Sequence, residues 1–253
     1  DIRRAGETGR RDLLELVDYS KSFYFPSVPS GVVPSINRGF SAPIKLETDL
    51  SREEQFFLMK NDTDEFNRWD VGRGLYQSDI LELRAKAERE EGIEAKGRYA
   101  PAGEEAAEVI SADLLEAFET VMNDEHIGPS FKSLMLTPPS TALVAEELEP
   151  IDYENIYRAR KKLLGRFASE FFDYFHDEYR RLHKISAEGM ERETFGLREL
   201  KNTYLGYLVE TGREEMRKLC LEQFYTAPTM SDRMAALSIL SKEETAEREE
   251  ALE

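Results

Sequence analysis

Apolar side chains recur at a helical spacing from about Asp152 to His183. Their mostly four-residue spacing places them on one face of a helix. A wide apolar face is typical of a helix that packs between neighbours rather than lying on a surface. The segment therefore predicts one long helix inside a helical fold. The residues on this face are Ile156, Leu163, Leu164, Phe167, Ala168, Phe171, Phe172, Phe175, Tyr179 and Leu182.

Helix-start signals predict further helices on both sides of that segment. Ser51 and Glu54 have the spacing of a capping box, in which the two side chains satisfy N–H groups at the start of a helix. Thr211 and Thr229 stand in the same spacing ahead of later helices at about 214–224 and 231–240, and another helix is expected at about 188–208. Five or more antiparallel helices with short joints favour a helical bundle or α-solenoid. Without a strict sequence repeat, a solenoid would be irregular.

The first 47 residues have a different pattern. Short β-type runs at Leu14–Val17, Phe23–Phe25 and Ile44–Leu46 are separated by stretches rich in proline, glycine and serine. So few strands cannot cover both faces of a sheet or protect its edges. We therefore predict two parts: residues 1–47 as the last strands of an incomplete β-sandwich, and residues 48–253 as a mainly α domain.

Charge and composition narrow the possible partners. The net charge of −17 argues against nucleic acid, because an acidic chain repels phosphate. No apolar run approaches the roughly 20 residues that a membrane-spanning helix needs, so we expect no membrane partner. A single cysteine, Cys220, excludes an internal disulfide and weakly favours a cytoplasmic location. Because the chain begins at Asp1 without a methionine or signal peptide, we expect a processed chain or a piece of a longer one.

One polar block could support either structure or function. It contains Asp62, Asp64, Arg68, Trp69 and Asp70. Asp64 and Arg68 are four positions apart on one predicted helix and can pair. Trp69, the only tryptophan, can anchor a core or an interface between domains. We expect these residues to anchor structure rather than to contact a substrate.

Other reactive side chains give weaker signals. Asp173 and His176 share a helix face, with His183 two turns away, but a di-metal bundle needs more carboxylates than this pattern supplies. We interpret that face as polar and solvated. Cys220 lies in an ordinary helix sequence and is expected to be a small buried residue. Glycine-rich phosphate-binding motifs are absent from the sequence, so we predict no cofactor in this chain.

Several blocks of the sequence resemble the zinc aminopeptidase N (alanyl aminopeptidase) family, in the branch shared by bacteria, plants and apicomplexan parasites. They are Arg38–Leu46 (RGFSAPIKL), Asn61–Asp70 (NDTDEFNRWD), Arg198–Asn202 (RELKN), and Gln223–Phe224 with Met230–Asp232 and Ala235–Leu237. Thr229 departs from the family pattern, which usually has asparagine there. The matching blocks lie between about Leu14 and Leu240.

The resemblance implies a place within a longer enzyme that removes N-terminal residues from peptides. Members have a β domain, a thermolysin-like zinc domain, a small β-sandwich and a large helical domain that encloses the peptide chamber. This chain would supply the end of the sandwich and the first part of the helical domain. Its partners would then be the catalytic domain of the same polypeptide and the peptides in the chamber, with zinc held by that catalytic domain.

The catalytic motifs of that family are absent here. An HExxH zinc motif needs two histidines four positions apart on one helix. The three histidines, His126, His176 and His183, include no such pair, and the family's GAMEN motif is missing too. We therefore predict no catalytic, cofactor-binding or metal-binding residues, and a chain that is inactive alone. The alternative is a free-standing α-solenoid that binds other proteins and has no peptidase activity.

Overall fold

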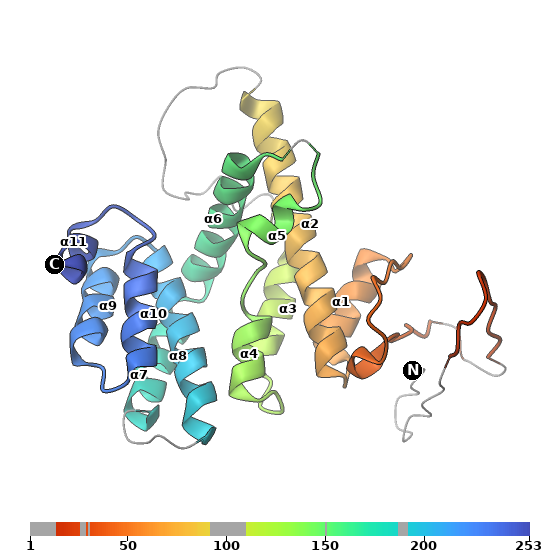
Figure 1. The fold of residues 1–253 in the computed structure, drawn as a ribbon, viewed down its shortest axis with the longest axis horizontal. Helices are drawn as coiled ribbons and strands as arrows, with labels where there is room; N and C mark the ends of the chain where they lie inside the picture. The colour runs from red at the N-terminus through yellow and green to blue at the C-terminus, as the bar shows by residue number, and fades with distance from the viewer. Residues whose placement is uncertain (1–13, 26–28, 30, 92–109, 150, 187–191) are drawn as a thin grey trace. The chain divides into compact units, whose positions relative to one another are not determined.

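The computed structural model describes residues 14–25, 29, 31–91, 110–149, 151–186 and 192–253. These residues form eleven α-helices and one short 3₁₀ turn (Figure 1). The prediction of a mainly α fold is confirmed. The chain divides into two compact units, Asp1–Leu75 and Tyr76–Glu253, and the division falls inside helix α2.

The first unit contains a loop, the 3₁₀ turn η1 (Arg38–Phe40), helix α1 (Arg52–Asn61) and the start of α2 (Glu65–Glu91). The predicted capping box at Ser51 is confirmed. The Glu54 N–H donates to Ser51 Oγ at 3.2 Å, and the Ser51 N–H donates to Glu54 Oε2 at 2.8 Å. Both bonds satisfy donors that the helix leaves without a partner, so α1 begins where the sequence predicts.

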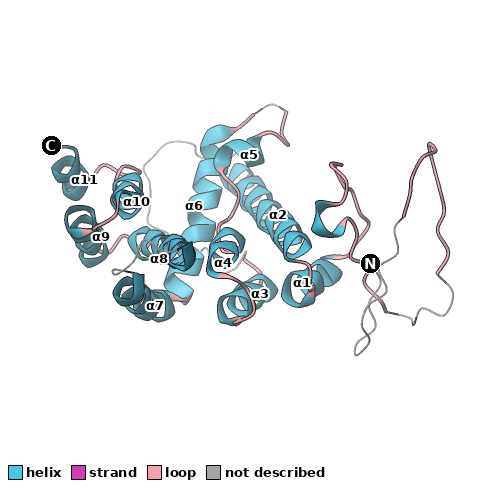
Figure 2. Ribbon diagram, turned by 60° about the horizontal axis from the view of Figure 1, so that its bottom comes forward, coloured by secondary structure: helices cyan, strands magenta, loops and turns pink. Residues whose placement is uncertain are grey.

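The predicted strands are not formed in the structure. Leu14–Val17, Phe23–Phe25 and Ile44–Leu46 adopt neither strand nor helix, and Figure 2 shows no strand in the part of the chain that is described. Val17 and Tyr24 expose 80% and 89% of their surface. A strand is stabilised by hydrogen bonds to a neighbouring strand, and the described residues supply none for these runs.

Among its described residues, the second unit contains the end of α2 and nine further helices. Helix α8 is central, because it packs against α4, α6, α7, α9 and α10, and Figures 1 and 2 show it among these neighbours. The helices are α3 (Ala112–Asn123), α4 (Pro129–Met135), α5 (Thr141–Ala145), α6 (Tyr153–Glu170), α7 (Phe172–Ser186), α8 (Arg192–Glu210), α9 (Glu214–Thr226), α10 (Met230–Leu240) and α11 (Ala246–Leu252).

Aromatic rings form the core of this second unit. Phe118 of α3 stacks on Phe167 of α6 with ring centres 4.2 Å apart. Phe175 of α7 stacks on Tyr207 of α8 at 4.7 Å. The four rings are fully or almost fully buried, and the Tyr207 hydroxyl donates to the Leu136 carbonyl at 2.6 Å. This core joins four helices, and its buried tyrosine is hydrogen-bonded as burial requires.

The long helix predicted from Asp152 to His183 is instead two helices, α6 and α7. Phe171 lies between them with φ −109° and ψ 24°, outside helical values. No proline or glycine marks this break. Phe171 stacks on Phe118 at 5.5 Å, so packing against another helix accompanies a break that the local spacing does not signal.

No helix within the described ranges combines the length and apolar character needed to cross a bilayer.

Candidate functional site

Asp62 lies at the junction between α1 and α2 and is almost fully buried. Its carboxylate accepts from Ser35 Oγ at 2.6 Å and from Arg38 Nη1 at 2.5 Å. It also accepts from the Asp64 N–H at 2.9 Å. The side chains of Arg38 and Asp62 expose only 8% and 2% of their surface. Asp62 therefore ties the preceding loop to the junction.

Asp64 and Arg68 complete the junction. Asp64 Oδ1 accepts from the Asn67 N–H, and Oδ2 accepts from the Gly39 N–H, both at 3.0 Å. The first bond caps the start of α2. Arg68 donates from Nε to the Met59 carbonyl at 3.0 Å, near the end of α1, where helical carbonyls lack partners. Each of these groups satisfies backbone atoms at a helix end.

Trp69 and Asp70 directly follow Arg68 on α2. Trp69 is half-buried, and its ring lies 5.7 Å from Phe66 and 5.6 Å from the Arg73 guanidinium. Asp70 accepts from Arg73 at 2.8 Å. The structure therefore brings the five predicted residues together along one junction. None is grouped with a histidine or cysteine, and the arrangement suits anchoring.

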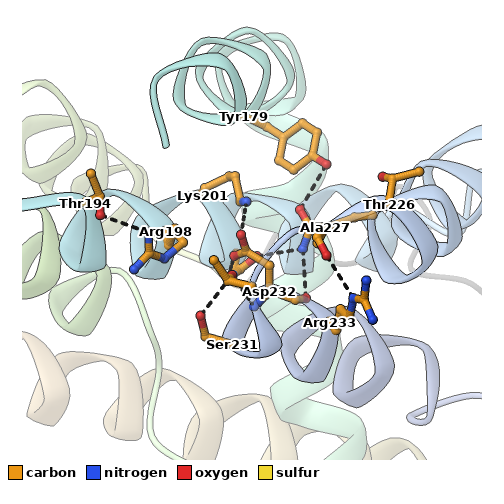
Figure 3. Close-up of polar contacts among 12 residues, drawn as sticks. Tyr179, Thr194, Arg198, Lys201, Thr226, Ala227, Ser231, Asp232 and Arg233 are labelled. Atoms are coloured by element: carbon orange, nitrogen blue, oxygen red, sulfur yellow. Dashed lines mark hydrogen bonds and ion pairs between the residues drawn. The ribbon is translucent and has the colours of Figure 1, made fainter. Parts of the chain in front are cut away.

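A second polar network lies between α7, α8, α9 and α10 (Figure 3). Lys201 Nζ donates to Asp232 Oδ2 at 2.8 Å, and both side chains expose only 3% of their surface. Asn202 Nδ2 donates to Asp232 Oδ1 at 2.8 Å. Gln223 Nε2 donates to Asn202 Oδ1 at 2.8 Å, and the Tyr179 hydroxyl donates to Gln223 Oε1 at 3.1 Å. We call these five residues the Asp232 network.

Burial and charge in the Asp232 network shift the pKa values of Lys201 and His183. Burial lowers the pKa of Lys201, and the hydrogen bond to Asp232 opposes this shift. Burial and the charge of Lys201 lower the pKa of His183, while Asp232 and Glu222 oppose that shift. Because the side chains of the network bond to each other, they suit the joining of helices better than chemistry on a substrate.

Asn202, Gln223 and Asp232 lie within the sequence blocks that resemble aminopeptidase N, but the sequence does not predict that these three residues contact each other. Thr229 accepts from the Asp232 N–H at 3.4 Å, which is half of the expected capping box. The other half is not made by Asp232, whose carboxylate turns to α8. The expected box at Thr211 is wrong: α9 is capped at Arg213 without a side-chain bond, and Thr211 Oγ1 donates back to the Leu208 carbonyl at 2.6 Å.

A groove follows the exposed side of α8. It consists of three adjoining cavities of about 780, 140 and 20 Å³, which share lining residues. Helix α4 forms one wall of the large cavity, α6 and α9 line the smaller cavities, and α10 with the following turn forms the opposite wall. From α8 the floor is lined by Phe195, Arg198, Glu199, Asn202, Thr203, Gly206, Tyr207, Val209 and Glu210. We call this feature the α8 groove.

The reactive side chains lie apart from this groove. Burial raises the pKa of the Cys220 thiol to about 12, which makes it a poor nucleophile. The three histidines do not line any of the three cavities. Within the described residues, no three histidine, cysteine, aspartate or glutamate side chains gather as a metal site would require. The lining of the groove includes serine, threonine, lysine and glutamate side chains but no histidine or cysteine.

Comparison with known families gives two adjoining matches. A family model described as a domain of unknown function with ARM repeats, DUF3458_C, matches residues 52–253. A second, described as a domain of unknown function with an Ig-like fold, DUF3458, matches residues 2–49.

Curated relatives of this chain are aminopeptidases N, and a solved structure shares its fold. The chain is 28% identical over 89% of its length to aminopeptidase N of Escherichia coli, and 32% identical over 90% to aminopeptidase N of Caulobacter vibrioides. It spans 24% of each relative. The crystal structure of Legionella pneumophila aminopeptidase A in complex with aspartic acid is 22% identical and matches with a TM-score of 0.69. That match covers 87% of this chain and 25% of the other. The resemblance to aminopeptidase N is thus confirmed.

Proposed function

This chain belongs to the ARM-repeat family DUF3458_C, and we propose that it is the non-catalytic helical part of a zinc aminopeptidase. The observation that carries the proposal is the alignment of about nine-tenths of the chain with a quarter of each aminopeptidase N relative. The rest of each relative is about three times as long as this chain. In the proposed protein, the catalytic domain lies in that remainder and the helical part helps to enclose the peptide chamber.

The donor set of this chain supports a non-catalytic role. A catalytic zinc site needs three protein ligands and an open position for water. His176 and His183 lie about two turns apart on α7, and His183 Nδ1 is shielded from solvent without a hydrogen bond in the described structure. His126 lies outside the helices, in the segment between α3 and α4. These residues do not fit a zinc site, so the proposed zinc belongs to the catalytic domain.

The N-terminal residues have a matching role in this proposal. The Ig-like family match over residues 2–49 supports assigning them to a β-sandwich, with residues 48–253 as the helical part. Leu16, Val17 and Tyr24 are largely exposed, as expected of side chains that a sandwich would cover. We include in the proposal the cytoplasmic location that the single cysteine favours.

The mass of the natural gene product tests the proposal. An antibody against this chain should detect, in a lysate of its source organism, a protein about four times as large as the chain. The immunoprecipitated protein should release chromophore from an alanyl anilide substrate, lose activity with a zinc chelator and regain it with added zinc. The isolated chain is the matched control and should be inactive. A product of the size of this chain, with no activity, would refute the proposal.

A free-standing binding module is the second candidate. The observation that favours it is the closed aromatic core of residues 76–253, which needs no further domain to bury Phe118, Phe167 or Phe175. The same immunoblot separates the two candidates, because the module predicts a product of the size of this chain.

A further inference from the structure

The α8 groove runs along most of one helix and narrows from one end to the other. From Phe195 to Glu210 the helix rises about 22 Å, which matches about six or seven residues of extended chain. The largest cavity, about 780 Å³, lies between α4, the first half of α8, and α10. The smallest, about 20 Å³, lies near Glu210 and Lys242. Because the cavity volume decreases toward Glu210, that end of the groove suits the end of a bound chain better than its middle.

A glycine lies in the floor of the groove, inside a helix. Gly206 has no neighbouring atom within 4 Å of the place where a Cβ would lie, so packing does not require it. Glycine weakens a helix relative to alanine. Its missing side chain leaves the backbone of α8 open to close approach by another chain. This differs from Gly196, where a Cβ would clash with Ser130 at 2.7 Å.

The narrow part of the groove is rich in cations. Lys161 pairs with Glu210 and Glu243, both at 2.5 Å. Arg160 donates to the Pro139 carbonyl at 2.7 Å, and neither Arg160 nor Lys242 forms an ion pair with a carboxylate among the described residues. The two cavities at this end are lined by four cations, Arg160, Lys161, Arg217 and Lys242, and by two carboxylates, Glu210 and Glu243, in a chain with a net charge of −17.

The charges at this end influence each other. Partial desolvation lowers the pKa of Lys242, and Glu210 opposes this, while the positive charges of Arg160 and Lys161 lower it further. A bound carboxylate would relieve the repulsion between Lys242 and Arg160. Some hydroxyl groups along the wide part of the groove already donate within the protein, as Thr137 does to the Ser133 carbonyl at 2.8 Å, and their lone pairs can still accept from peptide N–H groups. The hydroxyl residues there are Ser130, Ser133, Thr137, Thr203, Ser231 and Ser238.

We propose that the α8 groove binds an extended peptide whose C-terminal carboxylate lies at the narrow end, against Lys242 and Arg160. The choice of a peptide rests on the proposed function, and it deepens that function by naming the end of the peptide that this chain would recognise. The bound chain would pass over Gly206, and its remaining residues would lie along the hydroxyl groups toward Phe195.

Binding to the 253-residue chain tests this site without any catalytic domain. The probe is a heptapeptide of glycine, serine and alanine with fluorescein at its N-terminus, and its twin carries a C-terminal carboxamide. Fluorescence anisotropy should show at least about tenfold tighter binding of the free carboxylate, because the amide lacks the charge. Equal affinities, or no binding of either peptide, would overturn the proposal. Neither result would refute the proposed function, which depends on the mass and activity of the natural product.

Two variants locate the site. Lys242→Gln should weaken binding of the carboxylate peptide about tenfold and abolish its advantage over the amide. The matched control is Lys218→Gln, since Lys218 pairs with Glu214 on α9 and does not line the groove. Gly206→Leu should abolish binding; no atom lies within 4 Å of the Cβ position, so the backbone has room for a side chain to start there, and the unfolding midpoint checks that the fold is kept. Gly74→Leu, a helical glycine outside the groove with similar open space, should leave affinity unchanged. Full binding by Gly206→Leu would contradict the placement.

Discussion

The two units of this protein use polar side chains in different ways. In residues 14–75, Asp62, Asp64 and Arg68 bond mainly to a nearby loop and to backbone groups at the ends of α1 and α2. In residues 76–253, Lys201 and Asp232 pair across two helices and are almost completely buried. The first arrangement fixes a local turn, and the second joins helices that surround an aromatic core. Polar residues at a junction and polar residues in a core should therefore contribute differently to stability.

The largest expected difference between the units is in local opening. Residues 14–25 form no helix or strand and are mostly exposed, whereas Leu163 and Phe175 have no exposed surface. Hydrogen exchange on the isolated chain should label residues 14–25 at least ~1000-fold faster than Leu163–Phe175. In a longer protein that carries the adjoining sequence, residues 14–25 should become protected. Equal protection of both segments in the isolated chain would mean that the units do not differ in this way.

The next largest effect is expected in the Asp232 network. Asp232→Ala would leave the Lys201 ammonium buried without its carboxylate, which costs about 3–5 kcal/mol of unfolding free energy. Replacing both partners, Asp232→Leu with Lys201→Met, should cost less because no buried charge remains. Urea denaturation followed by circular dichroism measures both. Asp173→Ala, at an exposed position on α7, is the control and should change stability by less than about 0.5 kcal/mol. A double variant less stable than Asp232→Ala would contradict this account.

The junction should show a smaller effect. Asp62→Ala removes an acceptor from Ser35, Arg38 and the Asp64 N–H, and we expect a loss of about 2 kcal/mol. The loss is smaller than at Asp232 because the Arg38 guanidinium keeps its hydrogen bonds to Ser35 Oγ at 3.0 Å and Thr63 Oγ1 at 2.8 Å. Asp70→Ala is the control: its pair with Arg73 is about one-third exposed, so about 0.5 kcal/mol or less is expected. If Asp62→Ala costs as much as Asp232→Ala, the distinction between junction and core fails.

The contrast between a local junction and a network that joins distant helices also determines which features the sequence could predict. The capping box at Ser51 depends on residues three positions apart, so local spacing was enough to find it. The Asp232 network joins residues 9 to 44 positions apart on four helices. Four of its members lie in the sequence blocks that resemble aminopeptidase N, yet no rule of local spacing predicts that Lys201 contacts Asp232. The break at Phe171 was missed for the same reason, since Phe118 lies 53 positions away (171 − 118).

The predicted strands are not formed among the described residues for a related reason. The run Phe23–Phe25 has β propensity, but propensity in a strand depends on neighbouring strands that pair with it. The described residues contain no such neighbour, and Tyr24 is exposed. The α8 groove was also invisible in sequence, because it depends on how α4 and α10 pack beside α8. Gly206 was its one signal: a glycine inside a strongly predicted helix often has a functional reason.

The smallest expected effect, a dependence of stability on pH, tests whether the Asp232 network is sensitive to a neighbouring charge. His183 of α7 faces Lys201 of α8, Asp232 of α10 and Glu222 of α9, and its ring lies 5.7 Å from Tyr179. Its pKa in the folded state is lowered from the ordinary 6.5, so below about pH 6.5 the unfolded chain binds a proton that the folded chain resists. This term should therefore reduce stability as the pH falls from 7 toward 5.

His183→Gln should flatten that part of the stability profile, because glutamine does not titrate. Urea midpoints measured at several pH values between 5 and 7 would show the change, and His126→Gln, at an exposed position, serves as the control. Carboxylates also titrate near pH 5. The informative quantity is therefore the difference between His183→Gln and the control in how steeply the urea midpoint changes with pH. A steeper fall in stability for His183→Gln would mean that protonated His183 stabilises Asp232 rather than competing with Lys201 for it. In that case the network would gain from a second cation, and burial of Lys201 alone would not explain why the four helices meet at Asp232.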